Sequence, residues 1–244
     1  MASRYFDEAI RAEEVVPGVL LELGGDEARH AVTVARLRVG ERISVGDGRG
    51  LVAEGIVESA EPRRLGVRVD EVRREPASAP RMTLVQALAK GDRDELAVQA
   101  ATELGVDAVV PWAAARSVSR WDGPKAEKGR ARWAVIAREA SKQSLRARLP
   151  EVQPVCTSAE LPARLAGQRV LLLEPSAETP LTALDFDERD VAFVVGPEGG
   201  IAPAELERFA AAGAEAVRLG ANVLRTSTAG PAAIGVLAAA LGRW

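Results

Sequence analysis

Apolar residues follow two different patterns along the chain, and the change falls near residue 80. Over residues 1–74, short β-rich runs at 19–23, 42–45, 51–58 and 65–72 are separated by turn-forming glycine, aspartate and proline. One helix fits between the first two runs, with Asp26 at its start and Gly40 beyond its end. The pattern predicts a small, mostly β domain over residues 1–74.

Strands and helices alternate in the rest of the chain. A Pro/Ala/Ser-rich stretch at residues 75–81 is typical of a linker, and we place the domain boundary there. Apolar runs then predict strands at residues 82–88, 107–112, 151–156, 169–173, 191–195 and 214–219, with helices at 92–104, 125–147, 159–166 and 203–212 and a small-residue helix at the end. Because the connections are short, this alternation predicts an α/β domain with a parallel sheet over residues 82–244.

Three of the predicted strands end abruptly. The run at 191–195 stops at Gly-Pro-Glu-Gly-Gly (196–200), the run at 214–219 stops at Gly220, and the run at 169–173 stops at Glu-Pro. Carboxyl ends of parallel strands lie at one edge of a sheet, where α/β domains bind ligands, and glycines let a backbone approach a flat ligand closely. We therefore expect the three loops to line one pocket, although one glycine cluster alone would suit a plain tight turn.

The residue inventory excludes several chemistries. The glycine motif is neither G-x-G-x-x-G nor a P-loop, which needs Lys followed by Ser or Thr. A single histidine, His30, and a single cysteine, Cys156, give no catalytic triad and too few ligands for zinc, so no metal is expected. We interpret His30 as a packed or surface side chain and Cys156 as a buried, inert thiol. A group transfer in which a cofactor supplies the reactive carbon fits these residues better.

Charge is unevenly distributed. The net charge is −3, but residues 116–148 hold ten Lys/Arg against three Asp/Glu, a net of +7. Arg138, Lys142 and Arg146 recur every four residues and form one basic stripe on the predicted helix. Such a stripe indicates contact with phosphates, and a solvated helix face is the alternative. No signal peptide and no membrane-spanning run is visible, so we expect a soluble cytoplasmic protein.

The motifs of the second half, taken together, resemble a known family. They are GPEGG at 196–200, Glu205, Leu219-Gly220, VLRT at 223–226 and Thr228-Ala229. With them the chain is similar to the 16S ribosomal RNA uracil-N3 methyltransferase family of the SPOUT superfamily. Supporting matches run along nearly the whole chain and include His30, Arg36, Gly40, Lys90, Arg116-Ser117, Gln143-Ser144 and Leu173-Glu174-Pro175. GPEGG with LG and LRT at this spacing is specific, whereas each piece alone is weak.

The resemblance implies S-adenosylmethionine as cofactor, held in a C-terminal trefoil knot, and a PUA-like, RNA-binding β-barrel at the N-terminus. It also implies a homodimer that acts on 16S rRNA of the small ribosomal subunit. Carried over position by position, it predicts cofactor contacts from Leu173, Gly196, Gly199, Gly200, Leu219 and Leu224. We predict that Arg225 orients the uracil or its phosphate, and we expect RNA contacts from Arg36, Arg116, Arg138, Lys142 and Arg146.

Two positions depart from the family pattern. Ser227 stands where the family usually has Glu, so a carboxylate base is not available there. Glu198 is the nearest other candidate, but a structural role in the turn fits it better. Ala202 stands where Ser or Thr usually caps the helix, at a cost of about 1 kcal/mol. Methylation of a ribose 2′-hydroxyl by a related SPOUT enzyme, and a non-catalytic RNA-binding or ribosome assembly role, stay open as alternatives. A nicotinamide-dependent oxidoreductase ranks below both, since its fingerprint is missing.

Overall fold

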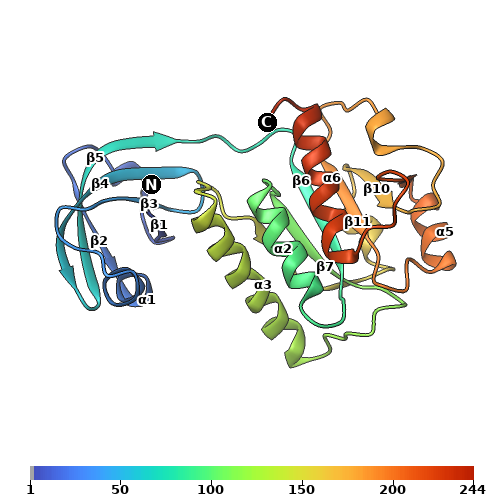
Figure 1. The fold of residues 1–244 in the computed structure, drawn as a ribbon, viewed down its shortest axis with the longest axis horizontal. Helices are drawn as coiled ribbons and strands as arrows, with labels where there is room; N and C mark the ends of the chain where they lie inside the picture. Colours follow the sequence, from blue (N-terminus) through green and yellow to red (C-terminus); the bar gives the residue numbers. More distant parts are fainter. Residues whose placement is uncertain (1–2) are drawn as a thin grey trace. The chain divides into compact units, whose positions relative to one another are not determined.

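Two β-sheets, one largely antiparallel and one parallel, organise the structure, a computed structural model that describes residues 3–244 (Figure 1). The chain divides into two units. The first contains the residues up to Ala77 together with Ser141–Leu149, and the second contains Ser78–Ala140 and Pro150–Trp244. The sequence had assigned Ser141–Leu149 to the second domain.

The first unit is built on a five-stranded sheet with the order β1-β3-β4-β5-β2. Its strands are β1 (Ser3–Phe6), β2 (Leu20–Gly24), β3 (Arg42–Gly46), β4 (Leu51–Glu61) and β5 (Arg64–Arg74). Neighbouring strands are antiparallel except β1 and β3. The sequence pattern missed β1, a strand of four residues, because so short a run carries little periodicity.

Helical structure in the first unit is short. A 3₁₀ turn, η1, spans Ala12–Glu14, and α1 spans Gly25–Arg29. The predicted helix does not continue regularly to Gly40, because α1 passes into a π-helical turn, η2 (His30–Val34). Arg36 then adopts a φ of +58°, a left-handed conformation that an ordinary side chain rarely takes and that stops the helix.

Hydrogen bonds explain why Ser141–Leu149 groups with the first unit. The guanidinium group of Arg4 donates to the Leu145 carbonyl, and the N–H of Leu149 donates to the Gly48 carbonyl at 2.9 Å. Lys142 Nζ lies 2.8 Å from Glu27 Oε1, with both side chains largely buried. Each of these partners is more than a hundred positions away in the sequence, so no local pattern reveals them.

The second unit contains a parallel sheet with the order β12-β10-β11-β6-β7-β8, and β9 also pairs with β7. Its strands are β6 (Met82–Ala87), β7 (Ala108–Ala113), β8 (Glu151–Val152), β9 (Cys156–Thr157), β10 (Arg169–Leu173), β11 (Val191–Val195) and β12 (Glu215–Val217). The predicted parallel α/β domain is confirmed. The strand predicted at 151–156 is divided in two around Pro154, which has no N–H for a ladder bond. The trefoil knot stays a prediction, since strand order and register do not establish how the chain threads.

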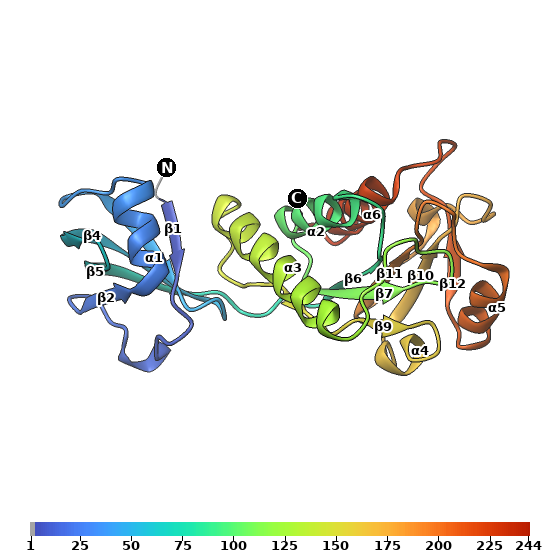
Figure 2. The ribbon, with the colours of Figure 1, turned by 90° about the horizontal axis from the view of Figure 1, so that it is seen from below.

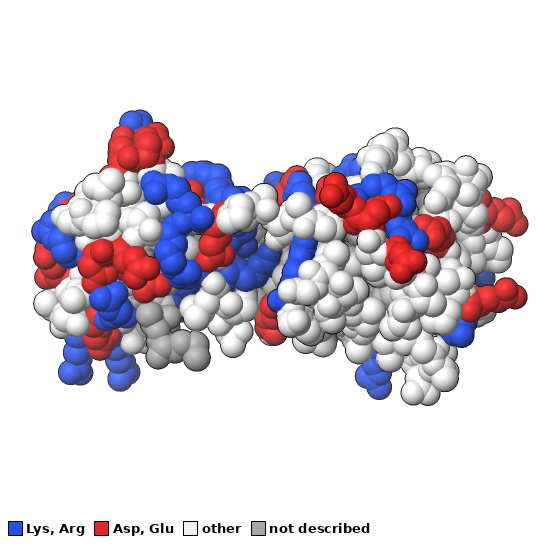
Figure 3. Space-filling view, turned by 90° about the horizontal axis from the view of Figure 1, so that it is seen from above, with Lys and Arg blue, Asp and Glu red and all other residues white. Residues whose placement is uncertain are grey.

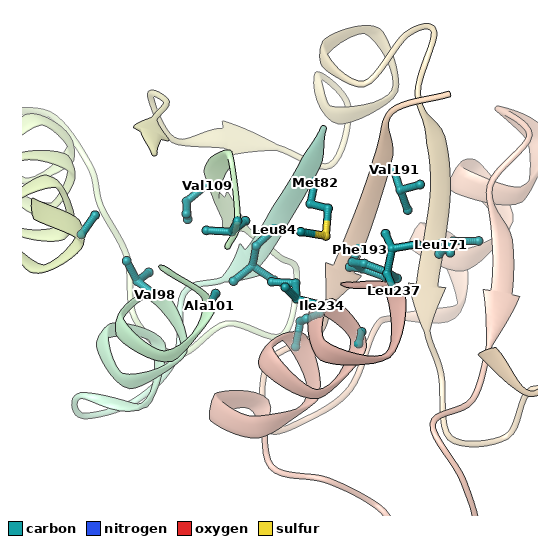
Figure 4. Packing of buried hydrophobic residues seen from close by; sticks show 14 of the residues in the cluster. Met82, Leu84, Val98, Ala101, Val109, Leu171, Val191, Phe193, Ile234 and Leu237 are labelled. Carbon is teal, nitrogen blue, oxygen red and sulfur yellow. The ribbon is translucent and has the colours of Figure 1, made fainter. Parts of the chain in front are cut away.

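Helices cover both faces of the parallel sheet (Figure 2). They are α2 (Arg93–Glu103), α3 (Pro124–Gln143), α4 (Leu161–Arg164), α5 (Pro203–Ala211) and α6 (Thr226–Ala240), with a 3₁₀ turn, η3, at Leu181–Ala183. One core joins the sheet to α2, α3 and α6 through residues such as Val98, Trp133 and Ile234. In Figure 4, Leu84, Phe193 and Leu237 of this core lie between strands and helices. The second core joins the opposite face to α4 and α5.

Two further features bear on the chemistry. Cys156 is buried, and burial raises the pKa of its thiol to about 11. The thiol therefore stays protonated at neutral pH, as expected of an inert core residue. Among residues 3–244, no helix has the length and apolar character needed to cross a bilayer.

We predict opposite effects for two glycine substitutions in α6. A Cβ at Gly230 would lie 2.6 Å from Leu84 Cδ1 in the core, so Gly230→Ala should destabilise the unit by about 1–3 kcal/mol through overpacking. In the matched control, Gly235→Ala, the Cβ would lie 3.4 Å from the Trp244 ring. That change should be neutral or stabilising by up to about 1 kcal/mol, the helix preference for alanine. Thermal unfolding measures both, and equal melting temperatures would contradict the close approach at Gly230.

Candidate functional site

The site lies where three neighbouring strands end. β12, β10 and β11 are adjacent and parallel, with Leu173 opposite Val217 and Leu172 opposite Val194. Their carboxyl ends therefore reach the same edge of the sheet, and the loops that follow enclose a cavity of about 330 Å³. The cavity is lined by Leu173–Pro175, Val195–Glu198, Gly200, Ile201, Val217–Gly220, Asn222–Thr226, Ala229 and, from α2, Arg93.

The structure brings together nearly all residues that the sequence assigned to a cofactor. Leu173, Gly196, Gly200, Leu219 and Leu224 line the cavity, and Arg225 lies at it as well. Gly199 is not among the lining residues. Its carbonyl instead accepts a hydrogen bond of 2.9 Å from Arg116 Nη1, so Gly199 links its loop to Arg116 and does not face the cavity.

Glycine is required at three positions of the wall by different constraints. A Cβ at Gly196 would lie 2.9 Å from Ile201 Cγ1, so a side chain there would clash with the packed end of the loop. Gly200 and Gly220 have φ values of +72° and +134°, which side chains rarely tolerate. The loops around the cavity can therefore adopt these conformations only because the three positions carry no side chain.

The cavity lies between two walls, the Gly196–Gly200 loop after β11 and residues 219–226 after β12. Backbone N–H donors on the second of these walls are unused. Within residues 3–244, none of the N–H groups of Leu219, Gly220, Asn222, Val223 and Leu224 donates a hydrogen bond, although all five residues line the cavity. Backbone polar groups in folded proteins are nearly always paired with protein or water. This stretch therefore offers a row of main-chain donors to a bound molecule.

The Gly196–Gly200 loop is hydrogen-bonded to the loop between β6 and α2 and to the start of α2. Glu198 Oε1 accepts hydrogen bonds from the Lys90 N–H at 3.1 Å and from Arg93 Nη1 at 3.2 Å. Asp94 supports the same loop by accepting the Ala89 N–H at 3.0 Å, and burial raises the pKa of its carboxyl. Glu198 thus serves the structure of the turn, which is the alternative that the sequence left open for it.

A second buried carboxylate fixes the start of α5. Glu205, 5% exposed, accepts the N–H of Ala115 at 2.8 Å, the Ser158 hydroxyl at 2.5 Å and the N–H of Ala202 at 3.1 Å. The last of these bonds is the glutamate half of a capping box, and the Ala202 side chain has no acceptor to supply the other half. Sequence reasoning noted Glu205 only as a motif match, and its position three residues after Ala202 was the available signal for this role.

One polar contact joins the two walls of the cavity. Thr226 Oγ1 donates to the Gly196 carbonyl at 2.9 Å, and Gln86 Nε2 donates to Thr226 Oγ1 at 2.9 Å. Gln86 is fully buried in β6, whose other residues are apolar except for Thr83. Sequence reasoning missed it. A lone amide among apolar residues was the signal that could have found it.

Arg225 is placed to act on a molecule at the cavity. It precedes α6 in extended conformation, and its exposed side chain makes no hydrogen bond or ion pair with any residue in the described range 3–244. Its guanidinium group therefore keeps its donors available.

The basic residues expected to contact RNA differ in their exposure and in their interactions with the rest of the protein. Lys142 is paired with Glu27, and Arg116 donates to Gly199 while staying exposed. Arg138 and Arg146 are partly buried, and Arg36 is exposed. Arg120, Lys125 and Lys128, just before and within the first turns of α3, are exposed and form no side-chain ion pair with described residues.

Many arginines of the first unit are paired with carboxylates. Figure 3 shows blue and red side chains interleaved over this unit. The ion pairs include Arg42–Asp70, Arg64–Glu22, Arg68–Glu58 and Arg73–Glu54. Exposed pairs of this kind contribute little stability, and they neutralise much of the charge on the sheet. Among residues 3–244, no group of His, Cys, Asp and Glu is arranged to hold a metal ion.

Comparisons with known proteins agree with this geometry. A family model described as an RNA methyltransferase domain matches residues 76–238, and one described as an RNA methyltransferase PUA domain matches residues 23–70. The ribosomal RNA small subunit methyltransferase E of Mycobacterium tuberculosis is 45% identical over 235 residues, which cover 93% of this chain and 89% of that protein. The protein of the same name from Bacillus subtilis is 32% identical over 236 residues, covering 93% and 92%.

Solved structures show the same fold. The Neisseria gonorrhoeae ribosomal RNA small subunit methyltransferase E, bound to S-adenosyl methionine, has a TM-score of 0.87 at 29% identity and covers 98% of both chains. A Legionella pneumophila protein in complex with the cofactor SAM has a TM-score of 0.88 at 29% identity, with 98% coverage of both chains. The domain models, the relatives and the loops at the strand ends lead to one conclusion: the chain belongs to the ribosomal RNA small subunit methyltransferase E family.

Proposed function

We propose that this protein transfers a methyl group from S-adenosylmethionine to N3 of one uridine in the RNA of the small ribosomal subunit. The observation that carries the proposal is the single cavity formed by the loops after β10, β11 and β12, with Arg225 beside it. The solved relatives from Neisseria gonorrhoeae and Legionella pneumophila contain S-adenosylmethionine, which supports the choice of cofactor.

The residues around the cavity fit this cofactor. A volume of about 330 Å³ lies within the range of roughly 300–1,000 Å³ typical of small-molecule sites. Leu173, Val195, Ile201 and Leu219 give apolar walls for a flat adenine ring. The unused N–H groups of residues 219–224 can pair with its polar edge. Recognition through main chain and apolar surface is therefore available without a charged side chain.

The chemistry of uracil defines what the protein must add. S-adenosylmethionine supplies an electrophilic methyl group when it is bound. Uracil N3 carries a proton, and the nitrogen becomes nucleophilic only after that proton has passed to solvent water and left a uracil anion. The guanidinium group of Arg225 can donate to a uracil carbonyl oxygen and stabilise the negative charge that develops there.

Carboxylates at the cavity are already engaged. Glu198 is bonded to Lys90 and Arg93, and Glu174 Oε1 accepts the Ser176 hydroxyl at 3.0 Å. Ser227 offers no carboxylate at the start of α6. We infer that this protein relies on positioning and on charge stabilisation rather than on a dedicated carboxylate base.

RNA binding and assembly complete the proposal. We assign phosphate contacts to Arg36, Arg116, Arg138 and Arg146, and add Arg120, Lys125 and Lys128 because their side chains are exposed. Lys142 is less suited, since a phosphate contact there would have to break its ion pair with Glu27. The homodimer implied by the family resemblance also stays part of the proposal.

The test of the proposed function is methylation of naked 16S rRNA and of small ribosomal subunits, followed by nucleoside mass spectrometry and mapping of the modified position. We expect N3-methyluridine at one position. A methyl group on a ribose 2′-hydroxyl would instead assign the protein to the other SPOUT chemistry. No transfer to either substrate, with no cofactor binding by calorimetry, would favour a non-catalytic RNA-binding role.

Arg225→Ala should separate cofactor binding from turnover. Loss of one donor to a developing negative charge typically reduces turnover by about 10²–10³-fold, whereas binding of S-adenosylmethionine should change by less than about threefold. Arg208→Ala is the matched control, because Arg208 is an exposed arginine of α5 outside the cavity lining. Wild-type turnover in Arg225→Ala would contradict the assignment.

The salt dependence of RNA binding should report on the exposed cations near the start of α3. Neutralising Arg120, Lys125 and Lys128 to Gln should weaken binding for all sequences and lower the slope of log K against log salt by about two, at roughly 0.7 per lost contact. Arg132→Gln is the control, because Arg132 is already paired with Glu95 at 2.9 Å. An unchanged slope in the triple variant would place the RNA elsewhere on the protein.

A further inference from the structure

Gln86 occupies a place where an apolar side chain would be expected. It lies in β6, between β11 and β7 in the sheet, with Val195 and Pro111 as its partners in register. It is fully buried, and it does not line the cavity. Its amide nitrogen nevertheless reaches a residue that does, because Nε2 donates to Thr226 Oγ1 at 2.9 Å and to the Ala87 carbonyl at 3.2 Å.

The direction of these hydrogen bonds follows from the partners. Were the amide turned over, its oxygen would face the carbonyl oxygen of Ala87, and two acceptors would repel each other. The nitrogen must therefore face Ala87 and Thr226. Both of its protons are then used, so the Thr226 hydroxyl accepts from Gln86 and has its single proton left for the Gly196 carbonyl.

This arrangement leaves one group unsatisfied. Within the described residues 3–244, Gln86 Oε1 is buried and has no hydrogen-bond partner. A buried acceptor without a donor lowers stability. Core packing alone does not account for an amide here, because an unbranched apolar side chain of the same length would fill the space without that cost.

The bond that Gln86 directs connects the two walls of the cavity. Gly196 opens the glycine loop at the end of β11, and Thr226 directly follows Arg225. Within residues 3–244, the bond from Thr226 Oγ1 to the Gly196 carbonyl is the one hydrogen bond between residues 196–200 and residues 219–226. The separation of the two walls, and the place of Arg225, therefore depend on which way one hydroxyl points.

We propose that Gln86 is a positioning residue of the methyl-transfer site, which acts by forcing the Thr226 hydroxyl to donate to the Gly196 carbonyl. The inference rests on the proposed function for its consequence in turnover, but the hydrogen-bond relay belongs to the protein without ligand. Gln86 is buried and does not line the cavity, so its effect is transmitted through Thr226.

The first test needs no cofactor. Gln86→Met keeps the length of the side chain and removes both donors, so the Thr226 hydroxyl becomes free to rotate. Hydrogen exchange in the ligand-free protein should become about tenfold faster at the amides of residues 228–230 and of Gly200, with α2 unchanged. Thr83→Val is the matched control, because it removes a buried hydroxyl from the same strand without touching either wall.

The second test asks whether Gln86 acts through Thr226. We expect Gln86→Met to raise the Kd for S-adenosylmethionine about tenfold and to lower kcat at saturating substrates by a similar factor. In a Thr226→Val background, the same substitution should have no further effect, because the hydroxyl it directs is gone. In a Thr226→Ser background, which keeps the hydroxyl, Gln86→Met should again raise the Kd and lower kcat.

Distinct outcomes overturn the two proposals. Gln86 does not position the walls if Gln86→Met and Thr83→Val have the same amide hydrogen exchange and the same Kd for S-adenosylmethionine. The same conclusion follows if the effects of Gln86→Met and Thr226→Val on Kd and kcat multiply in the double variant. If Gln86→Met unfolds, the exchange comparison between Thr226→Val and Thr226→Ser decides whether the hydroxyl joins the walls. A wild-type protein that binds no S-adenosylmethionine would overturn the proposed function, whereas the exchange result would still decide on the relay.

Discussion

The shared register of β12, β10, β11 and β6 is the constraint on which the rest of the structure depends. Leu173 lies opposite Val217, Leu172 opposite Val194, and Val195 opposite Gln86, so adjacent strands stop at nearly the same level. The loops that follow must therefore meet at one edge, and the cavity results from the register more than from any single loop. Because helices cover both faces of the sheet, its strands are almost entirely apolar, and polar chemistry is displaced to the strand ends.

Side chains and main chain divide the work at that edge. The side chains of Glu198, Arg116 and Thr226 form hydrogen bonds with backbone groups of the loops and hold the loops in place. The groups left for a ligand are mainly the N–H donors of residues 219–224 and apolar surface. At such a site, the side chain matters mainly where it would obstruct the cavity or the backbone. Glycine is needed where a Cβ would intrude, as at Gly196, whereas an exposed residue such as Val223 contributes its backbone whatever its side chain.

The sequence predicts what is local and misses what is long-range. Apolar runs that stop at glycine or proline locate β10, β11 and their loops, and strand–helix alternation predicts the parallel sheet that brings them together. The short β1, the π-helical turn after α1 and the contacts of Ser141–Leu149 carry no local signal. Glu198 and Lys90 are 108 positions apart and Gln86 and Thr226 are 140 apart, so only the folded chain reveals these pairs. The motif resemblance supplied the cofactor and the reaction, which periodicity alone does not contain.

For the proposed reaction, the start of α6 suggests how the site can favour a uracil anion although the carboxylates at the cavity, Glu174 and Glu198, are engaged elsewhere. The helix has no side-chain cap at its N-terminus, so the first N–H groups, at Thr226 and Ser227, keep their partial positive charge at the end that follows Arg225. A glutamate in place of Ser227 would partly cancel that charge. The present sequence instead combines the helix end with the exposed guanidinium group of Arg225, and in the proposed reaction both would act on charge that develops at the uracil carbonyl oxygens. In that proposal, stabilising the anion would lower the free energy needed to remove the N3 proton, which is the part of the reaction that the cofactor cannot supply.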